Sequence, residues 1–216
     1  MWNIKLKQGQ KLFFTSDTHY HHKNICRGTT NWTGDLDATR PFETLEEMDD
    51  TIVNNINEVV GEDDILVHLG DWSFGGFEYV VEFRQRINCR NIHLILGNHD
   101  HHIERNRQGV QGNFIKTSHY EVLHVTDEDG DDLNYDFVIS HFPIVSWHDM
   151  NRGRFHVFGH VHLPEDRKLM PGRSMDVGMD GNNLRPYELK EVVAILEHRP
   201  IKTTVIPSDH HEQEVR

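Results

Sequence analysis

The chain has 216 residues, 36% hydrophobic and 26% charged, with a formal net charge of −13 at pH 7. This length suits one domain with a sizeable core, so we expect a single domain over 1–216 whose last residues, 207–216, form a loose tail. The acidic balance argues against a large non-specific nucleic-acid surface. With two cysteines, the chain has no disulfide framework. It also shows no apolar core of a signal peptide and no apolar stretch long enough to cross a bilayer. We therefore expect a cytoplasmic protein without a membrane partner.

The first predicted elements are strands. Residues 2–7 and 11–16 flank Gln8-Gly9-Gln10 and have the pattern of a hairpin that leads into the first core strand. The polar stretch 19–41 is too long for a bare connection in a compact domain. We therefore expect it to be functional or to lie over a site.

An amphipathic helix is predicted next. Thr44 and Glu47 have the spacing of a capping box. Apolar residues then recur at helical spacing as far as Gly61, namely Leu45, Met48, Ile52, Ile56 and Val59. This apolar stripe should cover one face of a sheet.

A strand at 65–70, a helix at 77–87 and a strand at 92–96 follow, and together they predict a parallel β-loop-α-β unit. The polar stretch 101–118 predicts an irregular connection with a short helix. Residues 119–125 and 133–140 then predict a hairpin.

The acidic turn of that hairpin, 126–131, is interpreted as solvated. It is too short for the twelve-residue calcium-binding pattern and lacks the closing glutamate.

The last third predicts a strand within 155–162, a loop at 164–174 and a short strand at 175–179. Residues 187–197 and 200–206 fit two closing strands or a helix and a strand, and periodicity does not decide between these. No internal repeat or linker is visible, which favours a single domain with two sheets.

Metal-binding residue types follow five of the predicted strands. A glycine such as Gly97 lets the chain turn sharply out of a sheet and approach a ligand closely. Open α/β sheets place their sites at the carboxyl ends of the strands. The chain has 18 histidines, and those at strand ends stand beside glycine and carboxylate. The candidate metal ligands are Asp17, His19, Asp71, Asn98, His141, His160 and His162.

This ligand set predicts two metal ions. Oxygen and imidazole ligands without thiolate suit Mn, Fe, Co, Ni or Zn and disfavour calcium. Seven ligands are too many for one ion with an open position, but they suit two ions that share a carboxylate. Two ions about 3.5–4 Å apart can stabilise the attacking and leaving oxygens of a displacement at phosphorus.

The chain carries an ordered set of motifs within 13–162. They are Asp17-x-His19, Gly70-Asp71, Gly97-Asn98-His99-Asp100, His141 and Gly159-His160-x-His162. This ordered set resembles the calcineurin-like metallophosphoesterase superfamily. The opening segment 16–25, with Arg40-Pro41-Phe42, is also similar to small uncharacterised bacterial and phage members of that superfamily.

The resemblance implies an α/β fold, a four-layer α/β/β/α sandwich of two mixed β-sheets. It also implies that a hydroxide between the two ions attacks phosphorus, and that His99 is catalytic without binding metal, because it stabilises the transition state or protonates the leaving oxygen. Asp71 would bridge the ions. One ion would be held by Asp17, His19, Asp71 and His162, and the other by Asp71, Asn98, His141 and His160.

One departure narrows the expected activity. The superfamily's Ser/Thr protein phosphatases continue Gly-Asp to an Asp-Arg-Gly, whereas this chain has Phe74-Gly75-Gly76. We therefore expect a metal-dependent phosphoric ester hydrolase acting on phosphodiesters or small phosphomonoesters, with nucleotide-type substrates favoured and manganese as the first choice of metal. The alternatives are a nuclease on short DNA or RNA and a non-catalytic metal-binding scaffold of the same fold.

Other polar residues carry weaker predictions. His22, Asn24 and Arg27 closely follow the first ligands and are candidate substrate contacts. His68 and His93 lie inside strands and are interpreted as core or face residues. Trp147 and His148 either line the pocket of the predicted site or contribute to packing. Packing is the commoner role of an aromatic residue in a loop.

Overall fold

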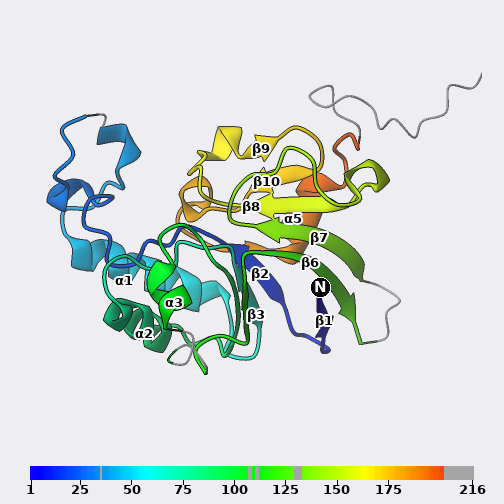
Figure 1. Cartoon of the computed structure of the whole chain (residues 1–216), viewed down its shortest axis with the longest axis horizontal. Coiled ribbons are helices and arrows are strands. Elements are labelled where there is room, and N and C mark those ends of the chain that lie inside the picture. The colour runs from blue at the N-terminus through cyan, green and yellow to red at the C-terminus, as the bar shows by residue number, and fades with distance from the viewer. Residues whose placement is uncertain (35, 107–108, 110–111, 129–132, 202–216) are drawn as a thin grey trace, which may run out of the picture.

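Two mixed β-sheets, one of six strands and one of five, form the centre of this α/β fold (Figure 1). The computed structural model describes residues 1–34, 36–106, 109, 112–128 and 133–201. The six-stranded sheet has the order β1 (Trp2–Leu6), β6 (Tyr120–Asp127), β7 (Asn134–Ser140), β8 (Phe155–Phe158), β10 (Ser174–Asp176) and β9 (Leu169–Met170). The five-stranded sheet has the order β11 (Tyr187–Glu188), β2 (Leu12–Thr15), β3 (Ile65–His68), β4 (Asn91–Ile95) and β5 (Lys116–Ser118).

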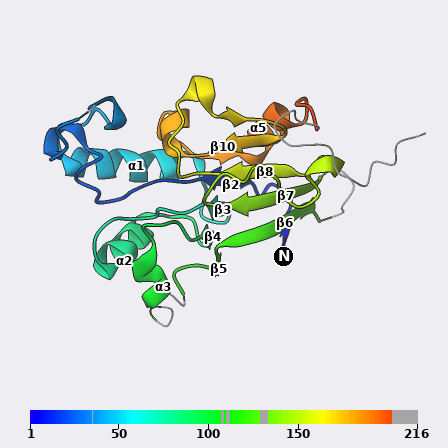
Figure 2. The same cartoon turned by 45° about the horizontal axis from the view of Figure 1, so that its top comes forward.

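Three of the described α-helices lie in connections between strands of the five-stranded sheet, and the fourth follows β11. The α-helices are α1 (Leu45–Val59), α2 (Phe77–Arg86), α3 (His101–Arg105) and α5 (Leu189–Leu196). Short 3₁₀ turns are η1 (Arg27–Thr29), η2 (Leu36–Ala38), η3 (Met150–Arg152), η4 (Glu165–Arg167) and η5 (Met179–Asn182). Figures 1 and 2 show α1, α2 and α3 beside the five-stranded sheet, on the side away from β6, β7 and β8.

The main core lies between the two sheets. Leu12 and Phe14 of β2 face it, and the rings of Phe14 and Phe137 are 5.1 Å apart between centroids. Phe13, on the opposite face of the same strand, packs into a second core beneath α1 and α2. A third, small cluster around Trp147 covers part of the outer face of the six-stranded sheet. Helix α5 packs within the inter-sheet core.

Parallel pairing places the carboxyl ends of neighbouring strands at the same edge of each sheet. β2, β3, β4 and β5 run parallel in one sheet, and β7, β8 and β10 run parallel in the other. The carboxyl ends of each set therefore lie at one edge of the sheet. A bridge between Ser16 and Gly178 joins the two edges, with Met179 N donating to Ser16 O at 3.1 Å.

Several predicted elements are confirmed. Helix α1 begins after Thr44, whose side chain accepts a hydrogen bond from Glu47 N at 3.1 Å. β3, α2 and β4 form the predicted parallel unit, and β6 and β7 form the predicted antiparallel hairpin. Residues 129–131 of its acidic turn, the segment 202–206 and the tail 207–216 lie outside the described residues.

The predicted N-terminal hairpin is wrong. β1 pairs in parallel with β6, whereas β2 lies in the other sheet between β11 and β3. Burial explains the difference, because every residue of β2 is buried and both its faces need covering, whereas β1 buries alternate residues only.

The segment 187–197 turns out to be a two-residue strand followed by a helix. Leu189, Val192, Val193 and Leu196 are buried at helical spacing, and Glu188 and Glu191 form a capping box. Among the described residues, no helix combines the length and apolarity needed to cross a bilayer. Cys26 and Cys89 are buried thiols.

His156 makes the stability of this fold depend on pH. The ring is fully buried between the Val138 carbonyl, 3.0 Å from Nδ1, and the Ile144 N–H, which donates to Nε2 at 3.1 Å. Burial lowers the pKa of His156 from 6.5 to about 4. Because this folded pKa lies below the unfolded one, the unfolded chain binds the extra proton as the pH falls from about 6.5 to 4, and stability is lost in that window.

At about 1.36 kcal/mol per pKa unit, His156 should remove about 3 kcal/mol of unfolding free energy between pH 7 and pH 4. Urea denaturation at several pH values measures this loss. The His156→Gln variant should show a shallower decline, whereas His198→Gln, at a side chain that is 82% exposed, should follow the wild type. Parallel curves for wild type and His156→Gln would contradict the assignment.

Candidate metal centre

The predicted metal ligands gather where the carboxyl ends of the two sheets meet. Asp17 and His19 follow β2, Asp71 follows β3, and Asn98 follows β4. The other three candidates follow strands of the six-stranded sheet, namely His141, His160 and His162. The bridge between Ser16 and Gly178 brings these two groups together.

Asp17, His19 and His162 form the first cluster, with one potential ligand atom from each within 4.8 Å of the others. His19 Nε2 lies 3.9 Å from Asp17 Oδ1 and 3.1 Å from His162 Nε2. Asp17 Oδ1 is buried and has no hydrogen-bond partner. A buried carboxylate oxygen without a partner is unfavourable, and a cation at this point would satisfy it.

Asp71, His141 and His160 form the second cluster, with the same mutual spacing. His141 Nε2 lies 3.5 Å from Asp71 Oδ2 and 2.9 Å from Asn98 Oδ1. Asn98 therefore adds an amide oxygen to this cluster.

Asp71 joins the two clusters. Its Oδ2 atom lies 3.5 Å from His19 Nε2 and 3.5 Å from His141 Nε2. Its other oxygen, Oδ1, accepts a hydrogen bond from His99 N at 2.9 Å. One oxygen is thus left to face both clusters, as a shared ligand requires.

The hydrogen bonds of two imidazoles fix which nitrogen faces the clusters. Nδ1 of His141 lies 2.8 Å from the Leu69 carbonyl, and Nδ1 of His162 lies 2.6 Å from Asp180 Oδ2. Because both oxygens accept hydrogen bonds, the Nδ1 atoms carry the protons and each Nε2 presents its lone pair. His141 Nε2 then faces the amide oxygen of Asn98, and a cation between these two atoms would stabilise both lone pairs.

Without metal, protons take part of that role. Burial by itself would lower the pKa of His141, but the hydrogen bond and charge of Asp71 raise it. Burial would likewise raise the pKa of Asp71, but His141 and His19 hold it well below its usual range. Burial raises the pKa of Asp17 to about 7 and drives that of His19 far down. Added positive charge at the clusters would offset the burial of these carboxylates.

Backbone strain is concentrated at these positions. Of the nine non-glycine residues with positive φ in the described part of the chain, five are candidate ligands. They are Asp17 (57°), His19 (47°), Asp71 (56°), His160 (72°) and His162 (48°). The left-handed conformation costs about 1–3 kcal/mol for such residues and is found mainly where function requires it.

Two glycines allow the segments to approach one another. A Cβ atom on Gly97 would overlap Asp71 Oδ1 and lie 2.5 Å from Asp71 N. A Cβ atom on Gly159 would overlap Ser16 Oγ and lie 2.5 Å from Asp17 Oδ2. Any larger residue at either position would displace a candidate ligand.

Asp100 supports the second cluster although the sequence analysis gave it no role. Its carboxylate accepts hydrogen bonds from Gly97 N and Asp71 N, each at 2.8 Å, and from Trp72 N at 3.0 Å. It therefore ties the turn after β4 to the turn after β3. The side chain is buried, and burial raises its pKa to about 6.

Asp180 and Arg40 support the first cluster, a role that the sequence patterns did not predict for either of them. The carboxylate of Asp180 contacts His162 Nδ1 and accepts from Arg40 Nε at 2.8 Å. The buried guanidinium of Arg40 also donates to the Thr18 carbonyl at 2.8 Å and the Asp17 carbonyl at 2.6 Å. This network connects the 19–41 segment with ligands from both sheets.

The imidazole of His99 lies beside the clusters, while its backbone N–H donates to Asp71 Oδ1. Its side chain is 36% exposed, and Nε2 is 4.0 Å from Asp71 Oδ2. The ring packs near Phe74, 5.3 Å away between centroids, and near His22, 6.1 Å away. It faces a cleft of about 330 Å³ that is also lined by five of the candidate ligands, His19, Asp71, Asn98, His160 and His162.

The three predicted substrate contacts are placed differently. His22 and Asn24 line the cleft. Arg27 instead donates from its guanidinium to Thr39 Oγ1 at 3.1 Å and to the Leu36 carbonyl at 3.2 Å, so it supports the 19–41 segment internally.

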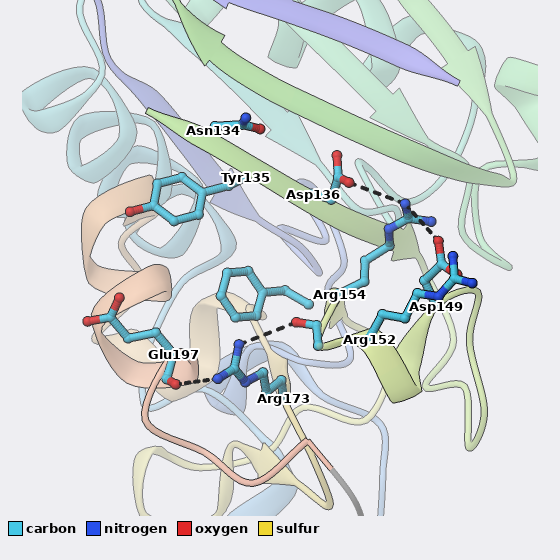
Figure 3. A pocket seen from close by; sticks show the side chains of 10 residues that line it. Asn134, Tyr135, Asp136, Asp149, Arg152, Arg154, Arg173 and Glu197 are labelled. Atoms are coloured by element: carbon cyan, nitrogen blue, oxygen red, sulfur yellow. Dashed lines mark hydrogen bonds and ion pairs between the residues drawn. The ribbon is translucent and has the colours of Figure 1, made fainter. Parts of the chain in front are cut away.

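Figure 3 shows another hollow, of about 450 Å³, beside β7 and β8. Its arginines are already engaged, since Arg154 pairs with Asp136 at 3.2 Å and Asp149 at 3.0 Å, and Arg173 donates to the Glu197 carbonyl at 2.7 Å. Trp147 and His148 lie on this side, where Trp147 packs in the small cluster of the outer sheet face.

Comparisons with known proteins agree with the fold and leave the activity open. No family model matches the sequence. An uncharacterized protein of Methanocaldococcus jannaschii, MJ1445, is 29% identical over 200 residues, covering 91% of this chain and 97% of that protein. The gene 66 protein of Mycobacterium phage L5 is 27% identical over 189 residues, covering 78% of this chain and 86% of that protein.

Among solved structures, a protein of unknown function from Aquifex aeolicus, AQ665, matches with a TM-score of 0.60 and 19% identity. The match covers 87% of this chain and all of that one. At this identity the likeness establishes a shared fold alone.

Metal binding at this centre should depend on Gly97. In the wild type, Mn²⁺ at about 100 times its Kd should raise the unfolding free energy by about 2.7 kcal/mol, seen as a higher Tm. In Gly97→Ala, the added methyl overlaps Asp71 and this Mn²⁺-dependent rise should be lost. The control is Gly34→Ala, where an added Cβ meets nothing within 4 Å. A full Mn²⁺ response in Gly97→Ala would show that ions bind elsewhere.

Proposed function

We propose that this chain is a metal-dependent phosphoesterase of the calcineurin-like metallophosphoesterase superfamily. It would hold two divalent transition-metal ions and hydrolyse phosphodiesters or small phosphomonoesters. The observation that carries the proposal is the position of Asp71 Oδ2, 3.5 Å from one histidine of each cluster. The unpartnered oxygen of Asp17 supports it.

The donor set fits the proposed ions. Carboxylate, amide and imidazole ligands without thiolate suit Mn, with Fe, Zn, Co and Ni as alternatives. Divalent ions in such sites activate water as a nucleophile and stabilise charge on phosphoryl oxygens. One ion would be held by Asp17, His19, Asp71 and His162, and the other by Asp71, Asn98, His141 and His160.

The side of the molecule beside the five-stranded sheet supports the four-layer sandwich expected of that superfamily. Helices α1 and α2 cover the outer face of the five-stranded sheet, as one helical layer of an α/β/β/α sandwich would. On the other side, the described part of the outer face carries the cluster of Val138, Trp147 and Met150, and α5 packs in the inter-sheet core.

His99 is the residue proposed to act on the substrate. Its backbone N–H is bound to Asp71 Oδ1, which fixes its side chain at the edge of the cleft. From there an imidazole can protonate the leaving oxygen or donate a hydrogen bond to the phosphoryl group. Rings of His19, His22 and Phe74 pack around it and restrict its orientation.

Phe74 supports the choice of substrate class. It lies where the protein phosphatases of the superfamily have the carboxylate that orients the catalytic histidine, and it lines the cleft with its ring 3.8 Å from that of His22. Gly75 follows in place of their phosphate-binding arginine. A cleft with an aromatic wall in place of a guanidinium favours phosphodiesters or small phosphomonoesters over phosphoproteins.

The two-ion proposal is tested at Asp71. Fully loaded wild type should contain two ions per chain by elemental analysis, and Asp71→Asn should weaken both sites because its shared oxygen is altered. His162→Ala, which removes a ligand of the first cluster only, should leave one ion bound. Manganese-dependent hydrolysis of bis-p-nitrophenyl phosphate should be lost in Asp71→Asn. A single ion in the loaded wild type would contradict the proposal.

The role of His99 is tested with two leaving groups. His99→Ala should keep both ions, since none of its atoms belongs to the clusters, and should lower the rate by about 10²–10⁴-fold. A general acid matters more for an alkoxide than for p-nitrophenolate, which leaves without a proton. If His99 is the acid, alkyl esters should lose more rate than p-nitrophenyl esters. Equal losses would assign it to charge stabilisation, and a wild-type rate on both would refute either role.

A further inference from the structure

A larger hollow, of about 920 Å³, opens beside the cleft of the candidate metal centre. Ile25, Trp32 and His162 line both spaces, so the hollow adjoins the cleft. The volume lies within the range of about 300–1,000 Å³ of small-molecule sites. A ligand with its phosphorus at the clusters therefore has room for an organic group in this hollow.

The walls of the hollow are largely apolar, and one of them is an exposed tryptophan. Trp32 is 43% exposed, and its ring meets that of His22 edge-on, 6.2 Å away. Such a ring offers a flat apolar face at the junction of the two spaces. The other apolar lining residues are Ile25, Ala38, Pro41, Phe42, Val161, Pro164 and Leu184.

The charged residues of the hollow argue against binding of a second phosphate group of the ligand there. Arg40 lines it, but the guanidinium is 3% exposed and already donates to Asp180 and to the carbonyls of Asp17 and Thr18. Asp180 also lines the hollow but is paired with Arg40, and Asp37 contributes a further carboxylate to the lining. An uncharged group suits this environment better than a di- or triphosphate does.

We propose that this hollow is the subsite for the base of a nucleoside phosphoester, with Trp32 stacking on the base. The inference rests on the proposed phosphoesterase function and names its substrate class. Bases are flat, and stacking on an aromatic side chain contributes about 1–3 kcal/mol per base. Asn183, which also lines the hollow, offers an amide donor and acceptor to the base edge.

The occupant is a single nucleoside and its ester phosphate. With a net charge of −13, the chain lacks the excess of basic residues that a long polynucleotide requires. The hollow also lies beside the first cluster, because His162 lines it.

Two esters with the same leaving group test this subsite. The p-nitrophenyl ester of thymidine 5′-monophosphate carries a base, and methyl p-nitrophenyl phosphate does not. In Trp32→Ala, the ratio of kcat/KM between the first and second ester should fall by about 5- to 100-fold, mainly through KM. Trp32→Phe, which keeps an aromatic face, should restore most of the ratio.

Leu36→Ala is the matched control. Leu36 is an exposed apolar residue of the same 19–41 segment, 44% exposed, and does not line the hollow, so its ratio should equal that of the wild type. An unchanged ratio in Trp32→Ala, or one that falls equally in Leu36→Ala, would overturn the subsite.

A binding measurement separates this inference from the proposed function. By calorimetry, Mn²⁺-loaded wild type should bind thymidine 5′-monophosphate more tightly than inorganic phosphate, and Trp32→Ala should reduce that difference. If neither ester is hydrolysed, the phosphoesterase proposal fails, and the calorimetric difference still decides the subsite. Equal affinities for the two ligands in the wild type would overturn the subsite even if both esters are hydrolysed.

Discussion

The burial of closely spaced polar ligand atoms is the constraint on which this structure depends. Asp17 Oδ1 has no partner, and the Nε2 atoms of His19 and His162 lie 3.1 Å apart. In an apolar interior a carboxylate oxygen without a partner is unfavourable unless positive charge lies beside it. The strained backbone at the ligand positions and the absence of side chains at Gly97 and Gly159 all serve to hold these atoms together. The local backbone strain thus coincides with a site that the proposed divalent ions would stabilise.

Much of the fold and of the candidate site could be predicted from the sequence, because local patterns specify them. Helix α1 is visible in its apolar spacing and cap, and the ligands are visible as polar residues directly after buried strands. Their convergence follows from parallel pairing, which places the strand ends at one edge. The supporting residues could not be found in this way. Asp180 and Arg40 are 140 positions apart in sequence, and no local pattern connects them.

The wrong hairpin has a related cause. A short polar turn between two apolar segments usually joins neighbouring strands. Here β1 meets β6, more than a hundred residues later, and the turn carries the chain from one sheet to the other. The decisive information was the complete burial of β2, which requires that other layers cover both faces of its sheet, and β2 lies between β11 and β3. That demand depends on the whole sheet and is invisible in the segment itself.

The pairing of β1 with β6 also has a consequence for the order in which the protein folds. During synthesis, β1 emerges long before its partner β6. The apolar face of β1 therefore remains exposed to solvent until β6 is made, and this face carries Trp2, Ile4 and Leu6. β2, β3 and β4 pair over shorter distances along the chain and can assemble earlier with α1 and α2. Loop-closure entropy favours the same order during refolding. The amino-terminal strand is therefore expected to be among the last elements to join the native sheet.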